Sequence, residues 1–318
     1  MPHRECPRLT RRMAAGVFAP QAGSGYIFAG GPEERASHVE AWWSAGNVVL
    51  AEIVRQEKAT LSVAIEGSLY EAHLRSHLEL ARLLECLPEK VYLDITGLAH
   101  HVWAPLLRAA LPVKRCLWAV YVEPGEYTRT PTPTEGTIYD LSEKISGIAP
   151  LPGFATLGDV GDDQYAFVPL LGFEGTRLIH VNEHVQAPGD ATVPVIGVPG
   201  FRLEYPFVSL KGNRKPLVDG RYWVNVRYAT ANCPFDLFFS LRGIMRDFQR
   251  GYLRIAPIGT KPHGLGAVLF ALSAEDRVEL IYDHPIRKTG RTTGSGRLCL
   301  YDISTFVASD EFRWAGAT

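Results

Sequence analysis

The turn from Gly259 to Lys261 combines a flexible backbone, a hydroxyl group and a cation within three residues. It follows a short apolar run that begins at Leu253 and precedes a run of small and apolar residues, so the sequence predicts a strand, a tight turn and a helix start. A helix N-terminus presents unpaired N–H groups and a partial positive charge, which attract anions. Pro262 suits the first helical turn, where a missing N–H costs nothing. The turn therefore predicts a site for a phosphate or another anion.

Polar residues also follow the other apolar segments of the chain. The candidates for acid–base chemistry among them are Asp94, Glu123, Glu174, Asp283 and His284. If these strand ends share one sheet edge, they line a cleft in which carboxylates work with His263 or His284 as general acid and base. Bound Mg²⁺ would reconcile carboxylates with a phosphate ligand. Ordinary turn chemistry is the alternative explanation for any one of these residues.

Two segments of the chain resemble each other. Each has a strand, a turn with Gly and Thr, a helix start with a histidine, and a further strand that ends in an acid. The corresponding residues are Thr96, Gly97, His100 and Glu123 in one segment and Thr260, Gly259, His263 and Asp283 in the other. We interpret them as two similar βαβ units, with chance similarity between common units as the alternative. Thr96 and Gly97 thereby become candidate ligand-binding residues.

Two further segments are basic. The stretch from Arg287 to Arg297 is rich in glycine and threonine and contains no acid, so it could close over a polyanionic ligand through Arg287 and Arg291. A flexible hairpin loop is the alternative. The stretch 203–228 has an irregular pattern and carries the cations Lys211, Arg214 and Lys215. Long irregular segments are often functional or mobile.

The order of apolar and amphipathic segments predicts the fold class. Strands are expected at 59–65, 90–95, 116–122, 167–171, 193–196, from 253, at 277–282 and at 298–301, and helices at 69–86, 99–111, 234–249 and after Gly175 and Lys261. Apolar strands that alternate with helices favour an α/β fold, doubly wound, with a mainly parallel Rossmann-like sheet and helices on both faces.

The domain organisation follows from composition. The stretch 125–161 is rich in Thr, Pro and Gly and is predicted to be a long loop. It suggests two Rossmann-like halves, 21–160 and 161–318, with one continuous domain as the alternative. The basic residues 1–20 are expected to form a disordered tail.

Composition argues against several classes of function. Lys and Arg number 33 and Asp and Glu 34, for a net charge of −1, so duplex DNA is not an expected partner. The five cysteines are far apart, and the pair His180 and His184 has no evident third ligand, so we expect no zinc site and a reduced, cytoplasmic protein. No apolar run approaches the ~18 residues of a membrane span, so no membrane partner is expected. The Walker A, GxGxxG and GxSxG patterns are absent.

The turn Gly259-Thr260-Lys261, after an apolar strand and before a small-residue helix, resembles the Gly-Gly-Thr-Lys turn of CRISPR-associated Rossmann-fold (CARF) domains. Ile258 stands in place of the first glycine, and Asp94-Ile-Thr96-Gly97 resembles a second, degenerate copy. The resemblance implies a Rossmann-like homodimer of bacterial defence whose strand ends bind a cyclic oligoadenylate or a similar nucleotide signal.

These observations predict a sensor or regulatory subunit that binds a phosphorylated small molecule or a short oligonucleotide. An enzyme that acts on a nucleotide phosphoester or glycosidic bond at the same cleft is the first alternative. A scaffold subunit that works with a partner protein encoded nearby is the second.

Overall fold

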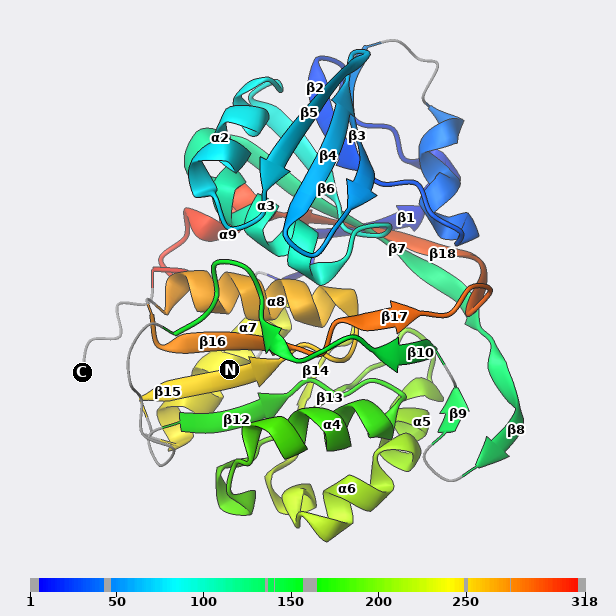
Figure 1. The fold of residues 1–318 in the computed structure, drawn as a ribbon, viewed down its shortest axis with the longest axis vertical. Helices are drawn as coiled ribbons and strands as arrows, with labels where there is room; N and C mark the ends of the chain where they lie inside the picture. The colour runs from blue at the N-terminus through cyan, green and yellow to red at the C-terminus, as the bar shows by residue number, and fades with distance from the viewer. Residues whose placement is uncertain are drawn as a thin grey trace. The chain divides into compact units, whose positions relative to one another are not determined.

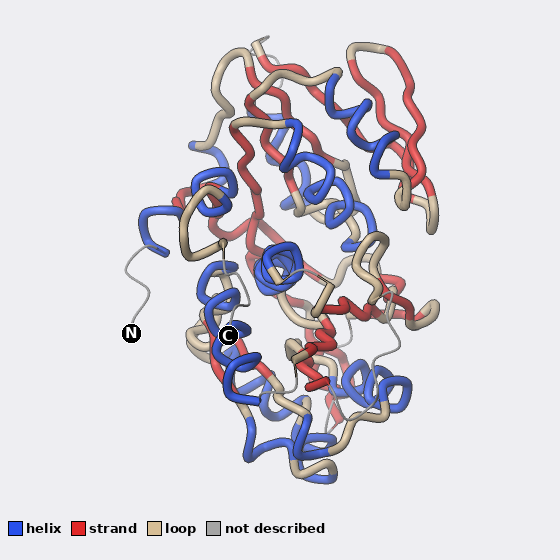
Figure 2. The backbone as a smooth tube through the Cα atoms, turned by 90° about the vertical axis from the view of Figure 1, so that its left-hand side faces the viewer, coloured by secondary structure: helices blue, strands red, loops and turns tan. Residues whose placement is uncertain are grey.

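The chain folds into two compact units in the computed structural model, which describes residues 6–42, 47–134, 137–139, 141–156, 165–248, 251–274 and 276–313. We call Pro7–Tyr127 with Thr292–Arg313 the terminal unit, and Thr128–Arg291 the central unit. Both units combine helices and strands (Figures 1 and 2). This division differs from the expected boundary near residue 160, because the strand after residue 291 pairs with strands from the first half of the chain.

The terminal unit holds one large sheet. Its strands are β1 (Thr10–Ala14), β2 (Ser24–Phe28), β3 (Val48–Gln56), β4 (Thr60–Ile65), β5 (Ser68–His73), β6 (Lys90–Asp94), β7 (Cys116–Tyr127) and β18 (Thr292–Asp302). Its helical segments are α1 (Cys6–Leu9), η1 (Ala15–Val17), η2 (Glu34–Ala41), α2 (His77–Glu85), α3 (His100–Val113) and α9 (Ile303–Val307), where η marks a 3-10 helix.

The strand order of this sheet is β1-β18-β7-β6-β2-β3-β4-β5. The four strands β7, β6, β2 and β3 run parallel, and the strands outside them pair antiparallel. Every residue of β2 is buried, as expected for a parallel strand covered on both faces. The fold is therefore mixed α/β, and β6, α3 and β7 form the first predicted βαβ unit.

The predicted helix 69–86 is wrong in its first part. Residues 68–73 form β5, which makes a hairpin with β4. The two turn residues Glu66 and Gly67 both have positive φ angles, the backbone that joins two strands through a tight turn. The helix begins only at His77, where the Ser76 hydroxyl accepts a hydrogen bond from Glu79 N and caps it.

Two segments expected to be irregular contain strands. Residues 10–14 of the expected tail form β1, which pairs antiparallel with β18. The expected loop 125–161 contains the end of β7 and four short strands of the central unit. Short pairs such as β10 with β17 give this Thr- and Pro-rich stretch its order through backbone hydrogen bonds that its composition does not reveal.

The central unit is built from shorter strands and more helices. Its strands are β8 (Arg129–Thr134), β9 (Thr137–Tyr139), β10 (Ser142–Ile145), β11 (Ala149–Pro150), β12 (Tyr165–Pro169), β13 (Val195–Gly197), β14 (Arg227–Ala229), β15 (Tyr252–Ala256), β16 (Val278–Tyr282) and β17 (Pro285–Arg287). Its helices are α4 (Gly175–Val185), η4 (Gly189–Ala191), α5 (Tyr205–Gly212), α6 (Arg214–Asp219), η5 (Tyr222–Asn225), α7 (Pro234–Phe248) and α8 (Lys261–Ser273).

Parallel pairing dominates the central unit. Strands β12, β15 and β16 run parallel side by side, β11 adds antiparallel to β16, and β13 pairs parallel with β14. Two isolated parallel bridges, Phe167 with Thr192 and Leu170 with Val195, place the chain around β13 next to β12. Strands β15 and β16 with α8 form the second predicted βαβ unit (Figure 1). In the part of the chain that the structure describes, we find no helix with the length and apolar character to cross a membrane.

Candidate ligand-binding site

The residues predicted to share one cleft divide between the two units. Asp94, Thr96, Gly97 and Glu123 belong to the terminal unit. Glu174, Gly259, Thr260, Lys261, His263, Asp283, His284, Arg287 and Arg291 belong to the central unit.

The turns that follow β12 and β15 pack backbone against backbone. A Cβ atom on Gly259 would lie 2.7 Å from the carbonyl oxygen of Leu171. A Cβ atom on Gly172 would lie 2.9 Å from the carbonyl oxygen of Ile258. Both distances are too short for a side chain, so the close approach requires glycine at each position. The backbones of the two strand ends are therefore in direct contact.

Thr260 and Lys261 begin helix α8. The Thr260 hydroxyl accepts a hydrogen bond from His263 N at 3.3 Å and donates one to the carbonyl oxygen of Ala231 at 2.7 Å. Thr260 is therefore the N-cap of α8. Lys261 is the first residue of the helix and is only 6% exposed. Its cationic side chain starts where the partial positive charge of the helix is largest.

His263 is part of the packing of α8. Its side chain is completely buried, and Nε2 lies 3.1 Å from the carbonyl oxygen of Thr230. Burial lowers the pKa of His263 to about 4, so the ring is neutral near pH 7. His263 was predicted to work as a general acid or base in the cleft, whereas its completely buried ring packs inside the unit beside the Thr230 carbonyl.

Asp283, predicted to be an acid–base residue, is the partner of a buried arginine. Arg177 Nε and Nη2 donate to its two carboxylate oxygens at 2.7 and 2.6 Å, and Asp283 is completely buried. Arg177 Nη1 also donates to the carbonyl oxygen of Ile258 at 2.8 Å. Burial alone would lower the pKa of Arg177, but the Asp283 carboxylate together with Tyr282 and Glu174 raises it. The pair ties α4 to the ends of β15 and β16.

Sequence analysis missed Arg177, although one signal was present. Arg177 lies in the first turn of α4, next to the partial positive charge of the helix. A cation at that position is unfavourable unless an anion lies nearby. The basic residue directly after the Gly172–Gly175 turn therefore indicated a carboxylate or phosphate partner, and within the protein that partner is Asp283.

Glu174 and His284 support the segment around β10. Glu174 accepts hydrogen bonds from the backbone N–H groups of Leu141 and Ser142 and from the Ser142 hydroxyl, at 2.9–3.0 Å. His284 has a positive φ angle of 41°, and its carbonyl oxygen accepts from Ser146 N and Oγ. The Glu174 carboxylate is therefore engaged in holding a loop.

The basic segment 287–297 is not one closing loop. Arg287 ends β17, and the residues from Thr292 onward belong to β18, which pairs with β7. Thr128 N donates to the carbonyl oxygen of Arg291 at 2.9 Å. Ladder hydrogen bonds thus hold the backbone on both sides of the turn at residues 288–291.

In the terminal unit, Asp94 lies in a buried polar cluster at the end of β6. It accepts hydrogen bonds from the Tyr26 hydroxyl at 3.0 Å and from Thr96 N at 2.8 Å. His38 Nε2 lies 2.9 Å from the Tyr26 hydroxyl and 3.3 Å from Asp94. Burial and the Asp94 charge raise the pKa of Tyr26. A Cβ atom on Gly97 would lie 2.1 Å from Ala29 O, so the strand ends of β2 and β6 meet through glycine, as in the central unit.

The other candidates of the terminal unit, Glu123 and Thr96, are also buried. Glu123 accepts from Cys299 Sγ at 3.7 Å, and burial with the Glu123 charge raises the pKa of Cys299 to about 12. The Thr96 hydroxyl accepts from Val122 N at 2.9 Å. Arg35 Nη1 donates to the carbonyl oxygen of Val122 at 2.9 Å. These contacts make Thr96 and Glu123 part of the structure that holds β6, β7 and β18 together.

Metal binding finds no support in the side chains. Across the described ranges, no three His, Cys, Asp or Glu side chains gather in a way that could hold an ion. Asp283 is occupied by Arg177, and Glu174 by backbone and hydroxyl donors. These two carboxylates, which the sequence suggested beside a phosphate, are therefore both engaged by donors of the protein.

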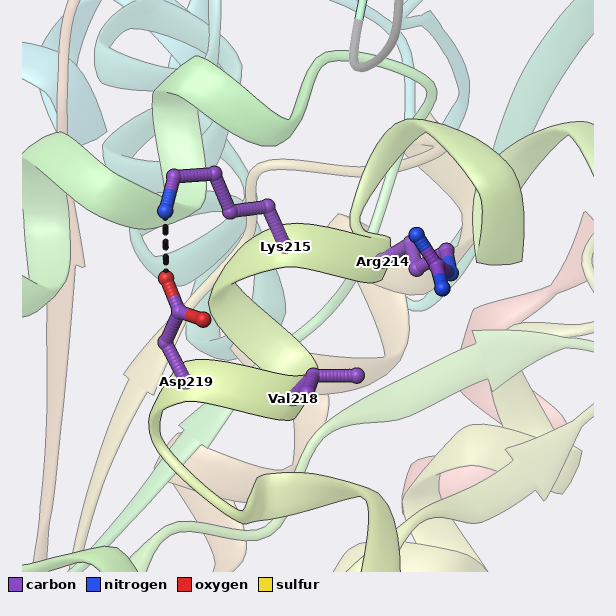
Figure 3. A pocket seen from close by; sticks show the side chains of 4 residues that line it. All are labelled: Arg214, Lys215, Val218 and Asp219. Atoms are coloured by element: carbon purple, nitrogen blue, oxygen red, sulfur yellow. Dashed lines mark hydrogen bonds and ion pairs between the residues drawn. The ribbon is translucent and has the colours of Figure 1, made fainter.

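A surface pocket of about 240 Å³ lies on α6, away from these turns in the sequence. Its lining residues are Arg214, Lys215, Val218 and Asp219 (Figure 3). Lys215 Nζ donates to Asp219 Oδ2 at 2.6 Å. Comparison with protein-family models, with curated proteins and with solved structures finds no match to this chain. Function is therefore argued from the geometry of the sites alone.

Proposed function

We propose that the central unit binds a nucleotide or another phosphorylated ligand at the carboxyl ends of β12 and β15. The observation that carries the proposal is the pairing of these two strands. They are parallel neighbours, and each leads directly into a helix, α4 after β12 and α8 after β15. Two helix N-termini therefore begin at one sheet edge, where their partial positive charges attract the same anion.

The proposal includes a Rossmann-like topology for this unit. Taken together, the ladders and bridges give the order β14-β13-β12-β15-β16. In that order, the chain proceeds in one direction from β12 through β13 to β14, and then returns to the other side of β12. The crevice at such a reversal is where open α/β sheets bind ligands. Helix α4 packs against α6, and α7 packs against α8, which supports two helical layers.

Within this site, Lys261 provides the full positive charge. A lysine at a glycine turn before a helix is suited to a phosphate as a point charge. The Gly172 and Gly259 turns pack backbone against backbone, which holds the strand ends that lead into α4 and α8 next to each other. This arrangement favours the nucleotide signal that the resemblance to CARF domains implies.

Binding is favoured over catalysis because the acids have structural partners. Asp283 is neutralised by Arg177, and Glu174 accepts three hydrogen bonds from the β10 segment. A general base needs an available lone pair within reach of the substrate proton. We therefore propose a sensor or regulatory role for the site.

Thermal unfolding with a panel of ligands tests this function. The panel contains inorganic phosphate, AMP, ATP, cyclic dinucleotides, and linear and cyclic oligoadenylates. A ligand that binds the folded protein raises the melting temperature by mass action, by the equivalent of about 2.7 kcal/mol at 100 times its Kd. Unchanged melting across the whole panel would refute the proposal. Any ligand that binds is then incubated with the protein, and its turnover would favour the enzyme.

Lys261→Met tests the role of the cation while retaining most of its buried stem. We expect this variant to melt near the wild type and to bind the ligand about 10- to 100-fold more weakly. A loss of this size is expected because the variant lacks one charge-assisted hydrogen bond to the ligand. Lys215→Ala is the matched control, since Lys215 lies in the same unit and pairs with Asp219. Wild-type affinity in Lys261→Met would remove Lys261 from the site.

A further inference from the structure

Helix α5 exposes its apolar side chains. Leu203, just before the helix, is 88% exposed, Phe207 is 72% exposed, and Leu210 is also exposed. Positions four and three residues apart lie on one side of a helix. Phe207 and Leu210 therefore share one side of α5, and that side faces solvent, the reverse of an ordinary surface helix. Together with Leu203, which is exposed in the turn before the helix, we call these side chains the apolar stripe.

The buried side of α5 is held by polar contacts. The Ser209 hydroxyl and Asn213 Nδ2 both donate to the carbonyl oxygen of Gly172, at 2.9 and 2.8 Å. A Cβ atom on Gly212 would lie 2.1 Å from the carbonyl oxygen of Phe173, so the helix backbone lies directly on the turn after β12. The apolar stripe thus contributes nothing to this packing, and its exposure calls for another explanation.

Charge surrounds the stripe unevenly. The segment 198–228 contains six basic residues and two acidic ones. The ion pair of Lys215 with Asp219 accounts for one residue of each sign, and the other acid, Glu204, is exposed beside Leu203. Lys211 and Arg214 follow the stripe directly in the sequence, and both are exposed. Arg214 also lines the pocket on α6 (Figure 3). The whole chain has a net charge of −1, so this excess of cations is local.

We propose that this surface docks a partner protein through an amphipathic segment with apolar side chains flanked by carboxylates. We call it the α5 face, and it comprises Leu203, Phe207, Leu210, Lys211 and Arg214. Apolar residues supply the buried centre of an interface, and opposite charges at its rim set specificity and association rate. This interaction is a second function beside ligand binding at the β12 and β15 ends, and it uses the solvent-facing side of α5.

Two other occupants fit the surface less well. A second copy of the chain would bring a surface with the same excess of cations, and like charges that face each other disfavour association. An anionic lipid surface would match the charge, but it would not use the concave pocket that Arg214 lines beside the face. A protein side chain can enter such a pocket.

A displayed library of randomised helical 18-residue peptides tests the proposal on the full chain. Peptides are selected on the wild type and counter-selected on Phe207→Ser. We expect the selected peptides to share apolar residues at i, i+3, i+4 and i+7 with an excess of Asp and Glu beside them. No enrichment, or enrichment of basic or uncharged flanks, would overturn the proposal.

Variants on the α5 face then locate the binding. For a selected peptide made synthetically, Phe207→Ser and Lys211→Glu should each weaken binding by at least ~10-fold, as expected for an anchor and for a reversed charge. Both residues are exposed, so both variants should keep the wild-type melting temperature. Leu78→Ser, at an exposed apolar position of α2 in the terminal unit, is the control and should retain full affinity.

Two further measurements address the other occupants. In the first, the protein is sedimented with vesicles of phosphatidylcholine and phosphatidylserine. Binding of the wild type to the vesicles that is abolished in Phe207→Ser would overturn the proposal. Sedimentation velocity would overturn it if the wild type were a dimer and Phe207→Ser a monomer. Peptide binding by a wild type that shows neither behaviour supports it.

Discussion

Thr260, Lys261 and His263 stand within one helical turn and have three different physical roles. Thr260 caps the helix with its hydroxyl, Lys261 brings a cation to the start of α8, and His263 is neutral in the interior. The differences arise from burial and from the partners that each side chain meets. A carboxylate such as Asp283 is likewise defined by its neighbour Arg177 and not by its position at a strand end.

The buried His263 should make stability depend on pH. The pKa of His263 is about 4 in the folded protein and near 6.5 in the unfolded chain. Between pH 4 and about 6.5, His263 is therefore protonated in the unfolded chain and neutral in the folded protein. Stability is therefore fully present above about pH 6.5 and falls as the pH drops toward 4. Lowering the pH from 7 to 4.5 should cost about 2 kcal/mol through this group alone.

Urea unfolding of wild type and His263→Gln at the two pH values measures this effect. The glutamine amide can donate to the Thr230 carbonyl in place of Nε2 but does not titrate. We expect the variant to lose about 2 kcal/mol less than the wild type on acidification. His184→Gln, at an exposed position of α4, is the control. Equal losses in wild type and His263→Gln would contradict this account.

Turns after parallel strands are the elements that organise both candidate regions. In the central unit, Gly172 and Gly259 let the ends of β12 and β15 meet, and in the terminal unit Gly97 lets the end of β6 meet Ala29. The same local device occurs in both, so the two βαβ units resemble each other in packing as well as in sequence. The acids at the ends of the neighbouring strands are bonded differently in each unit.

Gly259→Ala should disrupt the meeting of β12 and β15. Its Cβ atom would lie 2.7 Å from Leu171 O and 2.9 Å from Leu170 O, and both obstacles are backbone atoms. We expect the free energy of unfolding to fall by about 2 kcal/mol, the usual cost of overpacking. Gly243→Ala in α7 has no atom within 4 Å of the added Cβ and should stabilise the protein by up to about 1 kcal/mol. Chemical denaturation compares the two, and a neutral Gly259→Ala would show that the turns can separate.

The two units are interleaved in the sequence. The central unit is one continuous segment, whereas the terminal unit needs both ends of the chain, because β18 lies between β1 and β7. The chain passes between the units after Tyr127 and after Arg291. The central unit is thus an insertion into the sheet connection between β7 and β18.

Residues 128–291 expressed alone should fold, since all strands that pair with β12, β15 and β16 come from this segment. We expect cooperative thermal unfolding by circular dichroism and dispersed amide resonances. Residues 7–127 alone should fail to do so, because β7 and β1 lose the strand that joins them. A folded 7–127 segment together with an unfolded 128–291 segment would reverse this assignment.

Local patterns in the sequence were sufficient for several elements. The α/β class, the strands β6, β7, β12 and β16, and the helix starts at His100 and Lys261 were predicted, since apolar periodicity and capping residues act over a few positions. The hairpin of β4 and β5 was missed, because apolar residues at 69 and 72 fit a helix as well as a strand. There the turn at Glu66 and Gly67 determines the outcome.

Long-range pairing determined the rest. Nothing near Asp283 in the sequence indicates Arg177, which lies 106 positions away, and nothing near Tyr127 indicates that β18 would return to β7. The stretch from residue 203 to 228 was predicted to be irregular, whereas Phe207 and Leu210, three positions apart, share one side of α5. Whether that side faces the core or solvent depends on what the opposite side can bond, and in α5 Ser209 and Asn213 bond the Gly172 carbonyl. A pattern along the chain specifies a face, and the partner of that face is specified by residues that are distant in the sequence.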